Sequence, residues 1–208
     1  MDAELFGVRI STGNKKAIKA TNYGDLLVAQ GLPASAVQTA QGNGYQAMST
    51  AAIAGLVVRP STTAAFTLWN GNAGGGKSYV IERIMAFNLV STAAQTFAGI
   101  WACVHPVGMS AVTADITAIK NTRGIANYGG NARLDTGATV TDDGWFPWGA
   151  SSEAEEAGVL PGGIICAPIG GKMIVPPTAG VSMHVVSGLV GDTFTHGFHW
   201  YEVQLDLD

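Results

Sequence analysis

The stretch that decides the fold runs from Gly71 to Val90 and reads GNAGGGKSYVIERIMAFNLV. Its opening residues satisfy the phosphate-binding pattern G-x-x-x-x-G-K-[ST] through Gly71, Gly76, Lys77 and Ser78. In a nucleotide-binding protein the glycine backbone would wrap the phosphates, Lys77 would neutralise them and Ser78 would bind Mg²⁺. The motif by itself therefore indicates a nucleotide site.

The residues after the motif argue against that interpretation, because a phosphate-binding loop leads into a helix. Here the apolar residues alternate with the period of a strand, with Arg83 as the exception, and a helical spacing fits the run only imperfectly. No β-α-β alternation follows, and no apolar run ending in Asp supplies a partner for Mg²⁺. We therefore predict a strand over residues 78–90, a glycine-rich hairpin turn before it and no bound cofactor. The residues predicted to share one strand face are Tyr79, Ile81, Met85, Phe87 and Leu89.

Short segments rich in Val, Ile, Thr and aromatic residues continue on both sides of this strand, separated by Gly, Pro, Asn and Asp. Strands at this spacing are typical of an antiparallel β-sandwich with a jelly-roll-like arrangement. We predict an all-β fold in which residues 51–208 form the sandwich and the C-terminal strands form a meander. The predicted strands cover residues 54–59, 64–69, 78–90, 96–105, 163–167, 172–175, 181–187 and 193–205.

Residues 1–50 lack a sustained apolar period and predict an irregular, extended N-terminal arm, with short helical turns near residues 23–30 and 34–40. Such an arm becomes ordered by lying on another surface, often that of a neighbouring subunit. Leu26, Leu27 and Tyr45 are its candidate packing anchors.

Residues 106–162 predict a long insertion in the sandwich, with one short helix near residues 109–120. A loop of this length is functional or forms an interface. Trp145 and Trp148 lie in it around Pro147, next to Phe146. These aromatic residues either plug one end of the sandwich or anchor a protein partner or a sugar.

The composition favours a subunit that buries much of its surface against neighbours. Only 12% of the 208 residues are charged, 47% are apolar and 28 are Gly. The net charge of -4 and the lack of a basic cluster beyond Lys15, Lys16 and Lys19 argue against a nucleic-acid partner. No stretch approaches the ~18 apolar residues of a membrane span, and residues 1–10 do not read as an export signal. We expect synthesis in the cytoplasm and no membrane contact.

The sequence offers no catalytic constellation, since no nucleophile elbow or zinc-binding helix motif is present. Cys103 and Cys166 lie in apolar runs and are expected to be buried free thiols. The histidines suggest a metal site only weakly, because a regular C-terminal strand would place His196 and His199 on opposite faces. We expect a protein that is not an enzyme and has no metal.

Two stretches carry a resemblance to known proteins. One is residues 66–84, with FTLWNG at its start and GGKSYVIERI at its end, and the other is GFHWYEV at residues 197–203. Together they resemble small virion structural proteins of tailed bacteriophages, including head decoration or cement proteins. The resemblance implies a β-sandwich homotrimer that sits on the lattice of the major capsid protein and is located in the virion, at the capsid surface.

The function that this resemblance implies is mechanical. Trimers would bridge neighbouring capsomers through the base of the sandwich, while the N-terminal arm reaches an adjacent subunit. The alternative is a jelly-roll module of a virion that binds carbohydrate or a receptor, with Trp145, Phe146, Trp148 and Asp143 as a sugar platform. Exposed, coplanar aromatic rings would favour this alternative, and buried rings would argue against it.

Overall fold

The computed structural model describes residues 6–7, 16–17, 34–91, 97–124, 127–151 and 164–205. The chain divides into two units, Met1–Ala36 and Val37–Asp208. In the first unit, β1 (Phe6–Gly7) pairs antiparallel with β2 (Lys16–Ala17). Helix α1 (Ala34–Ala40) begins in the first unit, ends in the second, and confirms the helical turn predicted at residues 34–40.

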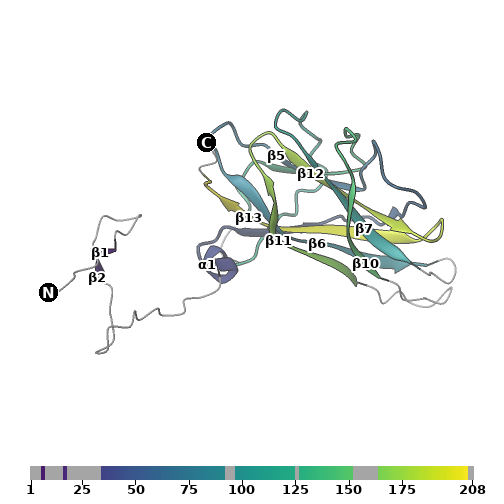
Figure 1. Cartoon of the computed structure of the whole chain (residues 1–208), viewed down its shortest axis with the longest axis horizontal. Coiled ribbons are helices and arrows are strands. Elements are labelled where there is room, and N and C mark those ends of the chain that lie inside the picture. The colour runs from purple at the N-terminus through teal and green to yellow at the C-terminus, as the bar shows by residue number, and fades with distance from the viewer. Residues whose placement is uncertain are drawn as a thin grey trace, which may run out of the picture. The chain divides into compact units, whose positions relative to one another are not determined.

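The second unit consists of two antiparallel sheets packed face to face, which confirms the predicted all-β sandwich (Figure 1). The five-stranded sheet has the order β10 (Phe146–Ser151), β7 (Ala98–His105), β12 (Gly180–Ser187), β5 (Phe66–Asn70) and β9 (Ala132–Thr136). The six-stranded sheet has the order β11 (Ile164–Val175), β6 (Ser78–Val90), β13 (Thr193–Val203), β3 (Gly44–Met48) and β8 (Lys120–Asn121), with β4 (Ile53–Ala54) also paired to β13.

Successive strands cross from one sheet to the other between β5 and β7 and again between β10 and β13. The chain therefore alternates between the two sheets of the sandwich. This alternation also shows that the predicted C-terminal meander is wrong, because β12 lies in a different sheet from β11 and β13. A meander and a crossing connection have the same strand and turn signals, and only the packing of the two sheets distinguishes them.

The core between the sheets is apolar and aromatic. Phe66 of β5 stacks on Phe198 of β13 with ring centroids 5.4 Å apart, and both side chains are buried. Trp200 is also buried, next to Tyr79. Full burial of each such side chain contributes about 1.5–3 kcal/mol, so these contacts between sheets are a main source of stability.

Strand β6 has the predicted bounds, but its side chains do not keep one alternation. Ile81 lies opposite Trp200 and Arg83 lies opposite His199, so Glu82 is an extra residue in the ladder. Tyr79 and Ile81 face the core before this β-bulge, whereas Ile84 and Ala86 face it afterwards. The prediction that Met85, Phe87 and Leu89 share a face with Tyr79 is therefore wrong. The Arg83 exception in the sequence pattern marks this shift.

The sandwich begins earlier than residue 51, which corrects the predicted arm of residues 1–50. Strand β3 pairs with β13 on one side and β8 on the other. Tyr45 packs against the core and Ala47 is buried in it. A short strand with alternating polar residues has too little apolar density to be recognised from the sequence, but the neighbouring strands provide its partners.

Other predicted elements also differ from the structure. The strand at residues 54–59 is reduced to β4, and those at 163–167 and 172–175 form one strand, β11. Gly170 and Gly171 adopt positive φ angles where the β11 register shifts. The turn predicted at residues 23–30 lies outside the described residues. No helix in the described part of the chain is long and apolar enough to cross a membrane.

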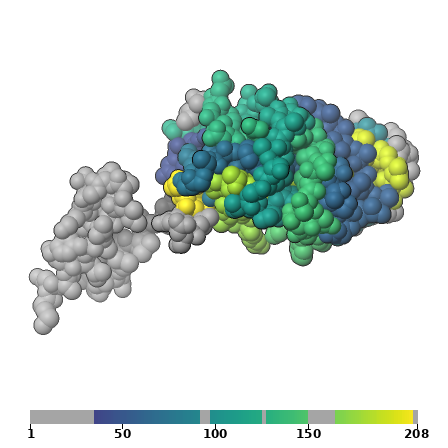
Figure 2. All heavy atoms as spheres, turned by 90° about the horizontal axis from the view of Figure 1, so that it is seen from above, coloured from purple at the N-terminus to yellow at the C-terminus, as the bar shows by residue number. Residues whose placement is uncertain are grey.

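Met109, Val112, Ala138, Val140 and Trp145, all from the predicted insertion, pack on the outer face of the five-stranded sheet. They form a second apolar cluster with that sheet, and Figure 2 shows the teal and green atoms of this part of the chain over the upper face of the molecule. The helix predicted at residues 109–120 is absent, and the chain is irregular there up to β8. Its buried residues are spaced as in a helix but reach different cores, Val112 the second cluster and Ile116 and Ile119 the main core.

Candidate functional site

The glycine-rich loop is a connection between the two sheets and not the predicted hairpin, since β5 and β6 belong to different sheets. Ser78 begins strand β6, where a phosphate-binding loop would begin a helix. Gly71 donates its N–H to the carbonyl of Asn131 at 3.1 Å, and a Cβ on Gly71 would lie 2.3 Å from that oxygen. Gly76 donates its N–H to the carbonyl of Ala73 at 2.9 Å, and the exposed Lys77 leads directly into β6.

Asn70 holds this connection in place from inside the sandwich. It is buried, and its Nδ2 donates to the carbonyls of Lys77 and Val175, each at 2.9 Å. Asn72 donates to the same Lys77 carbonyl. A buried amide that joins β5 to the start of β6 and the end of β11 explains why the strand before the glycine-rich loop ends in Asn.

The predicted interface residues lie in different environments. Leu26 and Leu27 fall outside the described residues. Tyr45 contacts its own chain, with its ring centroid 5.0 Å from Tyr128 and 6.1 Å from Trp200. Trp145 is buried and donates its indole N–H to the carbonyl of Ser61 at 2.7 Å. It belongs to the second apolar cluster, together with Ala64 and Cys103.

The remaining aromatic residues of the insertion do not form a flat platform. Phe146 is exposed and Trp148 is half-buried, with ring centroids 5.6 Å apart and planes inclined by 68°. Stacking on the face of a sugar requires an open ring, and Trp145 offers none because it is buried. The geometry therefore differs from that of a sugar platform.

The cysteines and histidines are only partly as expected. Cys103 is buried, whereas Cys166 is exposed on β11, which corrects the prediction of two buried thiols. His196 is fully buried beside His184, and neither of its ring nitrogens has a hydrogen-bond partner. His199 contacts Tyr201 on the other face of β13, as predicted. No three His, Cys, Asp or Glu side chains in the described residues lie close enough together to hold a metal ion.

Desolvation sets the protonation of His196. Burial, with a smaller effect of His184, lowers the pKa of His196 to about 3, and burial also lowers the pKa of His184. Both imidazoles are therefore neutral at physiological pH. Because protonation of His196 is unfavourable in the folded protein, acid should lower the stability of the fold.

A buried carboxylate lies near the glycine-rich loop. Glu202 accepts a hydrogen bond from the hydroxyl of Tyr128 at 2.7 Å, and its burial raises its pKa. The same Tyr128 hydroxyl accepts the N–H of Ala132 at 2.7 Å. This cluster joins β13 to the start of β9, so its evident role is to hold the two sheets together at this end.

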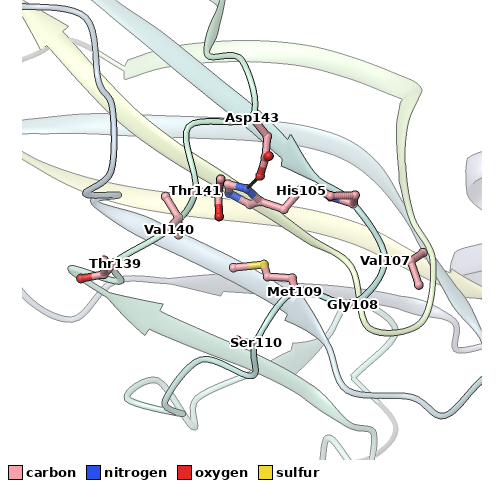
Figure 3. Close-up of a pocket in the computed structure, with 10 residues that line it drawn as sticks. His105, Val107, Gly108, Met109, Ser110, Thr139, Val140, Thr141 and Asp143 are labelled. Carbon is pink, nitrogen blue, oxygen red and sulfur yellow. Dashed lines mark hydrogen bonds and ion pairs between the residues drawn. The ribbon is translucent and has the colours of Figure 1, made fainter.

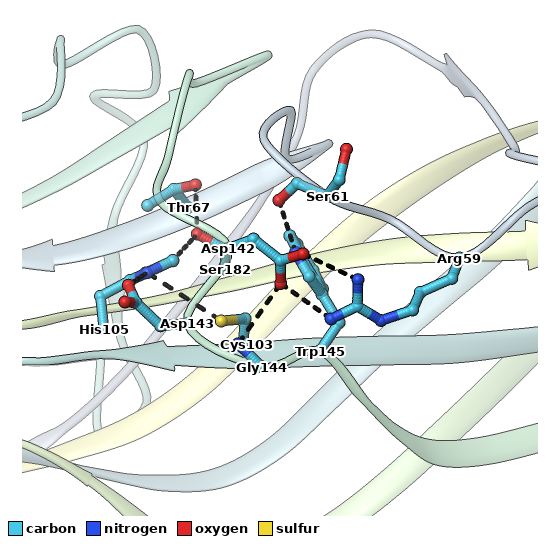
Figure 4. Close-up of polar contacts among 10 residues, drawn as sticks. All are labelled: Arg59, Ser61, Thr67, Cys103, His105, Asp142, Asp143, Gly144, Trp145 and Ser182. Carbon is cyan, nitrogen blue, oxygen red and sulfur yellow. Dashed lines mark hydrogen bonds and ion pairs between the residues drawn. The ribbon is translucent and has the colours of Figure 1, made fainter.

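A chain of hydrogen bonds that sequence reasoning did not predict links Thr67, Ser182, His105 and Asp143 (Figure 4). Oγ1 of Thr67 lies 2.8 Å from Oγ of Ser182, which lies 2.8 Å from Nε2 of His105. Nδ1 of His105 lies 2.7 Å from Oδ2 of Asp143. An ionised carboxylate can only accept hydrogen bonds, so Nδ1 of His105 donates to Asp143.

Three neighbouring strands position this chain. Thr67 on β5 lies opposite Ser182 on β12, which lies opposite Cys103 on β7, and His105 follows two residues later on the same face. The loop before β10 brings Asp143 next to His105, at the end of this row of polar side chains. Polar residues at these positions are also expected on a sheet face that is exposed to water. The sequence therefore gives no signal that the insertion buries Thr67, Ser182 and His105.

The order carboxylate, imidazole, hydroxyl resembles that of a catalytic triad, but the accessibility of the hydroxyl does not. Ser182 has 0% of its surface exposed, and its hydroxyl is already bonded to Thr67. A substrate cannot reach it in this structure. The arrangement instead fixes the His105 ring and, through it, the segment that carries Asp143.

A pocket of about 400 Å³ opens beside Asp143, between residues 105–110 and residues 139–143 (Figure 3). Next to it, Arg59 binds Asp142 through two hydrogen bonds of 2.8 Å each. The Arg59 guanidinium lowers the pKa of Asp142. The pocket is lined by His105, Pro106, Val107, Gly108, Met109, Ser110, Thr139, Val140, Thr141 and Asp143.

Comparisons with protein-family models, with curated proteins and with solved structures found no match.

Proposed function

We propose that this protein is a non-enzymatic structural subunit that works by docking one face of its sandwich against other protein subunits. The observation that carries the proposal is the difference between the two sheets. Residues of the insertion pack on the outer face of the five-stranded sheet, whereas the outer face of the six-stranded sheet has exposed apolar side chains, among them Ile164, Ile174 and Met48, beside the exposed Arg83 and Lys172.

The register of the strands defines this accessible face. Ile164 lies opposite Phe87, Cys166 opposite Met85, and Ile174 opposite Val80, all with side chains on the side away from the core. Ile164 is 66% exposed, and Met48 on β3 is 42% exposed. Contiguous apolar surface of this kind marks an interaction site. The docking face, as we name it, consists of Met48, Val80, Met85, Phe87, Ile164, Cys166 and Ile174.

The specific assembly that we propose is a virion. A homotrimer on the lattice of the major capsid protein agrees with the low share of charged residues and with the resemblance of residues 66–84 and 197–203 to decoration or cement proteins. Jelly-roll sandwiches also occur widely among capsid components. The alternative, a carbohydrate- or receptor-binding module, has less support because Trp145 is buried and the rings of Phe146 and Trp148 are steeply inclined.

The docking face can be tested with two matched substitutions. Ile164 on the face and Val58 in the loop after β4 are exposed to almost the same extent, 66% and 65%. We expect the wild-type chain to form an oligomer by light scattering, Ile164→Glu to weaken it, and Val58→Glu to leave it intact, because a buried carboxylate without a partner opposes association. Circular dichroism checks that both variants fold.

Two results would contradict this proposal. One is a monomer at every concentration that also fails to bind purified capsid lattices. The other is an oligomer that Val58→Glu disrupts and Ile164→Glu does not, which would move the interface to the end of the sandwich that carries the loop after β4.

A further inference from the structure

The pocket beside Asp143 is lined by a carboxylate but by no Lys or Arg. The nearby Arg59 is committed to Asp142 by two hydrogen bonds and does not contact Asp143 in the structure. Asp143 therefore brings a carboxylate to a pocket without Lys or Arg, and its partner in the described structure is the buried imidazole of His105.

The hydrogen-bond chain beneath the pocket holds this carboxylate in a fixed orientation. Nδ1 of His105 lies 2.7 Å from Oδ2 of Asp143, and Nε2 of the same ring lies 2.8 Å from the hydroxyl oxygen of Ser182. The Ser182 hydroxyl is also hydrogen-bonded to the hydroxyl of Thr67, 2.8 Å away. His105, Ser182 and Thr67 are all buried, and a buried network whose members are all hydrogen-bonded is rigid. A ligand that binds Asp143 would therefore lose little free energy in ordering the carboxylate, and this favours its affinity.

The walls of the pocket determine what kind of cation fits. Val107, Met109 and Val140 provide apolar surface, while Ser110 and Thr141 provide hydroxyl groups (Figure 3). A volume of about 400 Å³ lies in the range of small ligand sites and exceeds the size of a bare metal ion. Apolar walls beside a fixed carboxylate suit a long side chain that has an aliphatic stem and a charged tip.

We propose that this pocket binds the charged end of an Arg or Lys side chain presented by another polypeptide. The guanidinium or ammonium group pairs with Asp143, and its aliphatic stem lies along Val107 and Val140. A charged hydrogen bond to a preorganised carboxylate is stronger than one to a flexible surface residue. This site is separate from the docking face and does not depend on the oligomeric state proposed above.

The cation has two possible sources, a second copy of this chain or a different protein. On the accessible side of the six-stranded sheet, Arg83 and Lys172 are exposed. Insertion of one of them into the pocket of a second copy would give a head-to-tail contact, and contacts of this type close into rings such as trimers. The chemistry at the pocket is the same for either source.

The direct test is a titration of the full-length, isotope-labelled protein with Nα-acetyl-arginine amide, followed by NMR. Its neutral analogue, Nα-acetyl-citrulline amide, is the matched ligand control. We expect saturable shifts at Gly108, Met109 and Thr141 with the arginine ligand and at least about tenfold weaker binding of the citrulline ligand. Equal affinity for both ligands, or shifts only at other residues, would overturn the proposal.

Matched variants identify the carboxylate. Asp143→Asn should lose the arginine response, whereas Asp115→Asn, which removes a carboxylate outside the pocket, should keep it. Should Asp143→Asn fail to fold, Thr141→Arg provides an independent test. It places a cation from the chain itself at the pocket and should prevent ligand binding. Unchanged arginine binding in Thr141→Arg contradicts the site.

The source of the cation follows from a further measurement. If a second copy supplies it, the arginine ligand will compete with self-association, and the double variant Arg83→Gln, Lys172→Gln will associate more weakly. If a different protein supplies it, self-association will be insensitive to the ligand while the pocket shifts persist.

Discussion

Nδ1 of His105 lies 2.7 Å from Oδ2 of Asp143, although the two residues are 38 positions apart and belong to a sheet strand and to the segment that covers that sheet. This contact, together with the Arg59–Asp142 ion pair and the Trp145–Ser61 hydrogen bond, attaches the covering segment to the sandwich. The segment is thus held by the buried His105 ring, by an exposed ion pair and by the buried Trp145 side chain. These contacts can be perturbed separately.

Removal of the Ser182 hydroxyl should destabilise the fold. Ser182→Ala leaves Nε2 of His105 and the hydroxyl of Thr67 without their buried partner, and we expect a loss of about 1–3 kcal/mol in the free energy of unfolding. Urea denaturation measures this loss. Ser110→Ala, at an exposed position, is the control and should change stability by less than about 0.5 kcal/mol. Equal effects of the two substitutions would show that the buried chain contributes nothing.

Trp145 and Phe146 should differ sharply despite being adjacent. Trp145→Ala removes a large buried side chain from the second apolar cluster, and we expect it to cost about 3–5 kcal/mol of folding stability. Phe146 is 60% exposed, so Phe146→Ala should cost well under half as much. Thermal and chemical denaturation of both variants provide the comparison. A small loss of folding stability in Trp145→Ala would be inconsistent with a main role of this side chain in the second apolar cluster.

The glycine-rich loop should depend on one glycine and tolerate change at another. Gly71→Ala places a Cβ 2.3 Å from the Asn131 carbonyl oxygen, whereas a Cβ at Gly74 has nothing within 4 Å. We expect Gly71→Ala to destabilise the fold by about 1–3 kcal/mol and Gly74→Ala to have little effect. Lys77→Ala should also be nearly neutral because Lys77 is exposed. A large loss of stability in Lys77→Ala would contradict the interpretation of Lys77 as an exposed loop residue without a structural role.

Stability should fall in mild acid because of the buried histidines. The folded-state pKa of His196 is lowered to about 3, below the ordinary value of about 6.5 that applies in the unfolded chain. The unfolded state therefore takes up the proton first. The resulting loss begins as pH falls through about 6.5 and continues toward pH 3, by at most about 1.4 kcal/mol per pH unit for this group. The lowered pKa of His184 adds in the same direction.

Urea titrations at neutral and mildly acidic pH measure this effect, and His196→Leu isolates its source. The variant should show a shallower fall in unfolding free energy with decreasing pH than the wild-type protein. Parallel curves for the two proteins would mean that other groups cause the acid sensitivity.

The buried Glu202 should have the opposite pH dependence. Its folded-state pKa is raised, chiefly by burial, so ionisation at neutral pH opposes folding. Glu202→Gln keeps an oxygen for Tyr128 and removes the charge, and we expect higher stability than wild type at neutral pH. The advantage should shrink as pH falls and the wild-type carboxyl becomes protonated. A variant less stable than wild type at neutral pH would contradict this account.

Several elements could be predicted from the sequence because their signals are local. The bounds of β6 follow from the glycine-rich loop before it and its apolar alternation, and α1 follows from its composition. The face of β6 could not be predicted beyond Glu82, because one extra residue inverts every later side chain. The spacing of Val112, Ile116 and Ile119 suggested a helix for a related reason, since burial against two separate cores imitates a helical period.

The sequence by itself determined that this chain is an all-β sandwich, that the glycine-rich motif precedes a strand, and that His196 and His199 lie on opposite faces of β13. Period, turn residues and composition act over a few neighbouring residues, so a single sequence contains them. Only the tertiary structure decided which sheet each strand joins, which face the insertion covers, and that Thr67, His105, Asp143 and Ser182 meet. Those contacts join residues far apart in the chain, and their energies exist only once the two sheets and the covering segment have packed together.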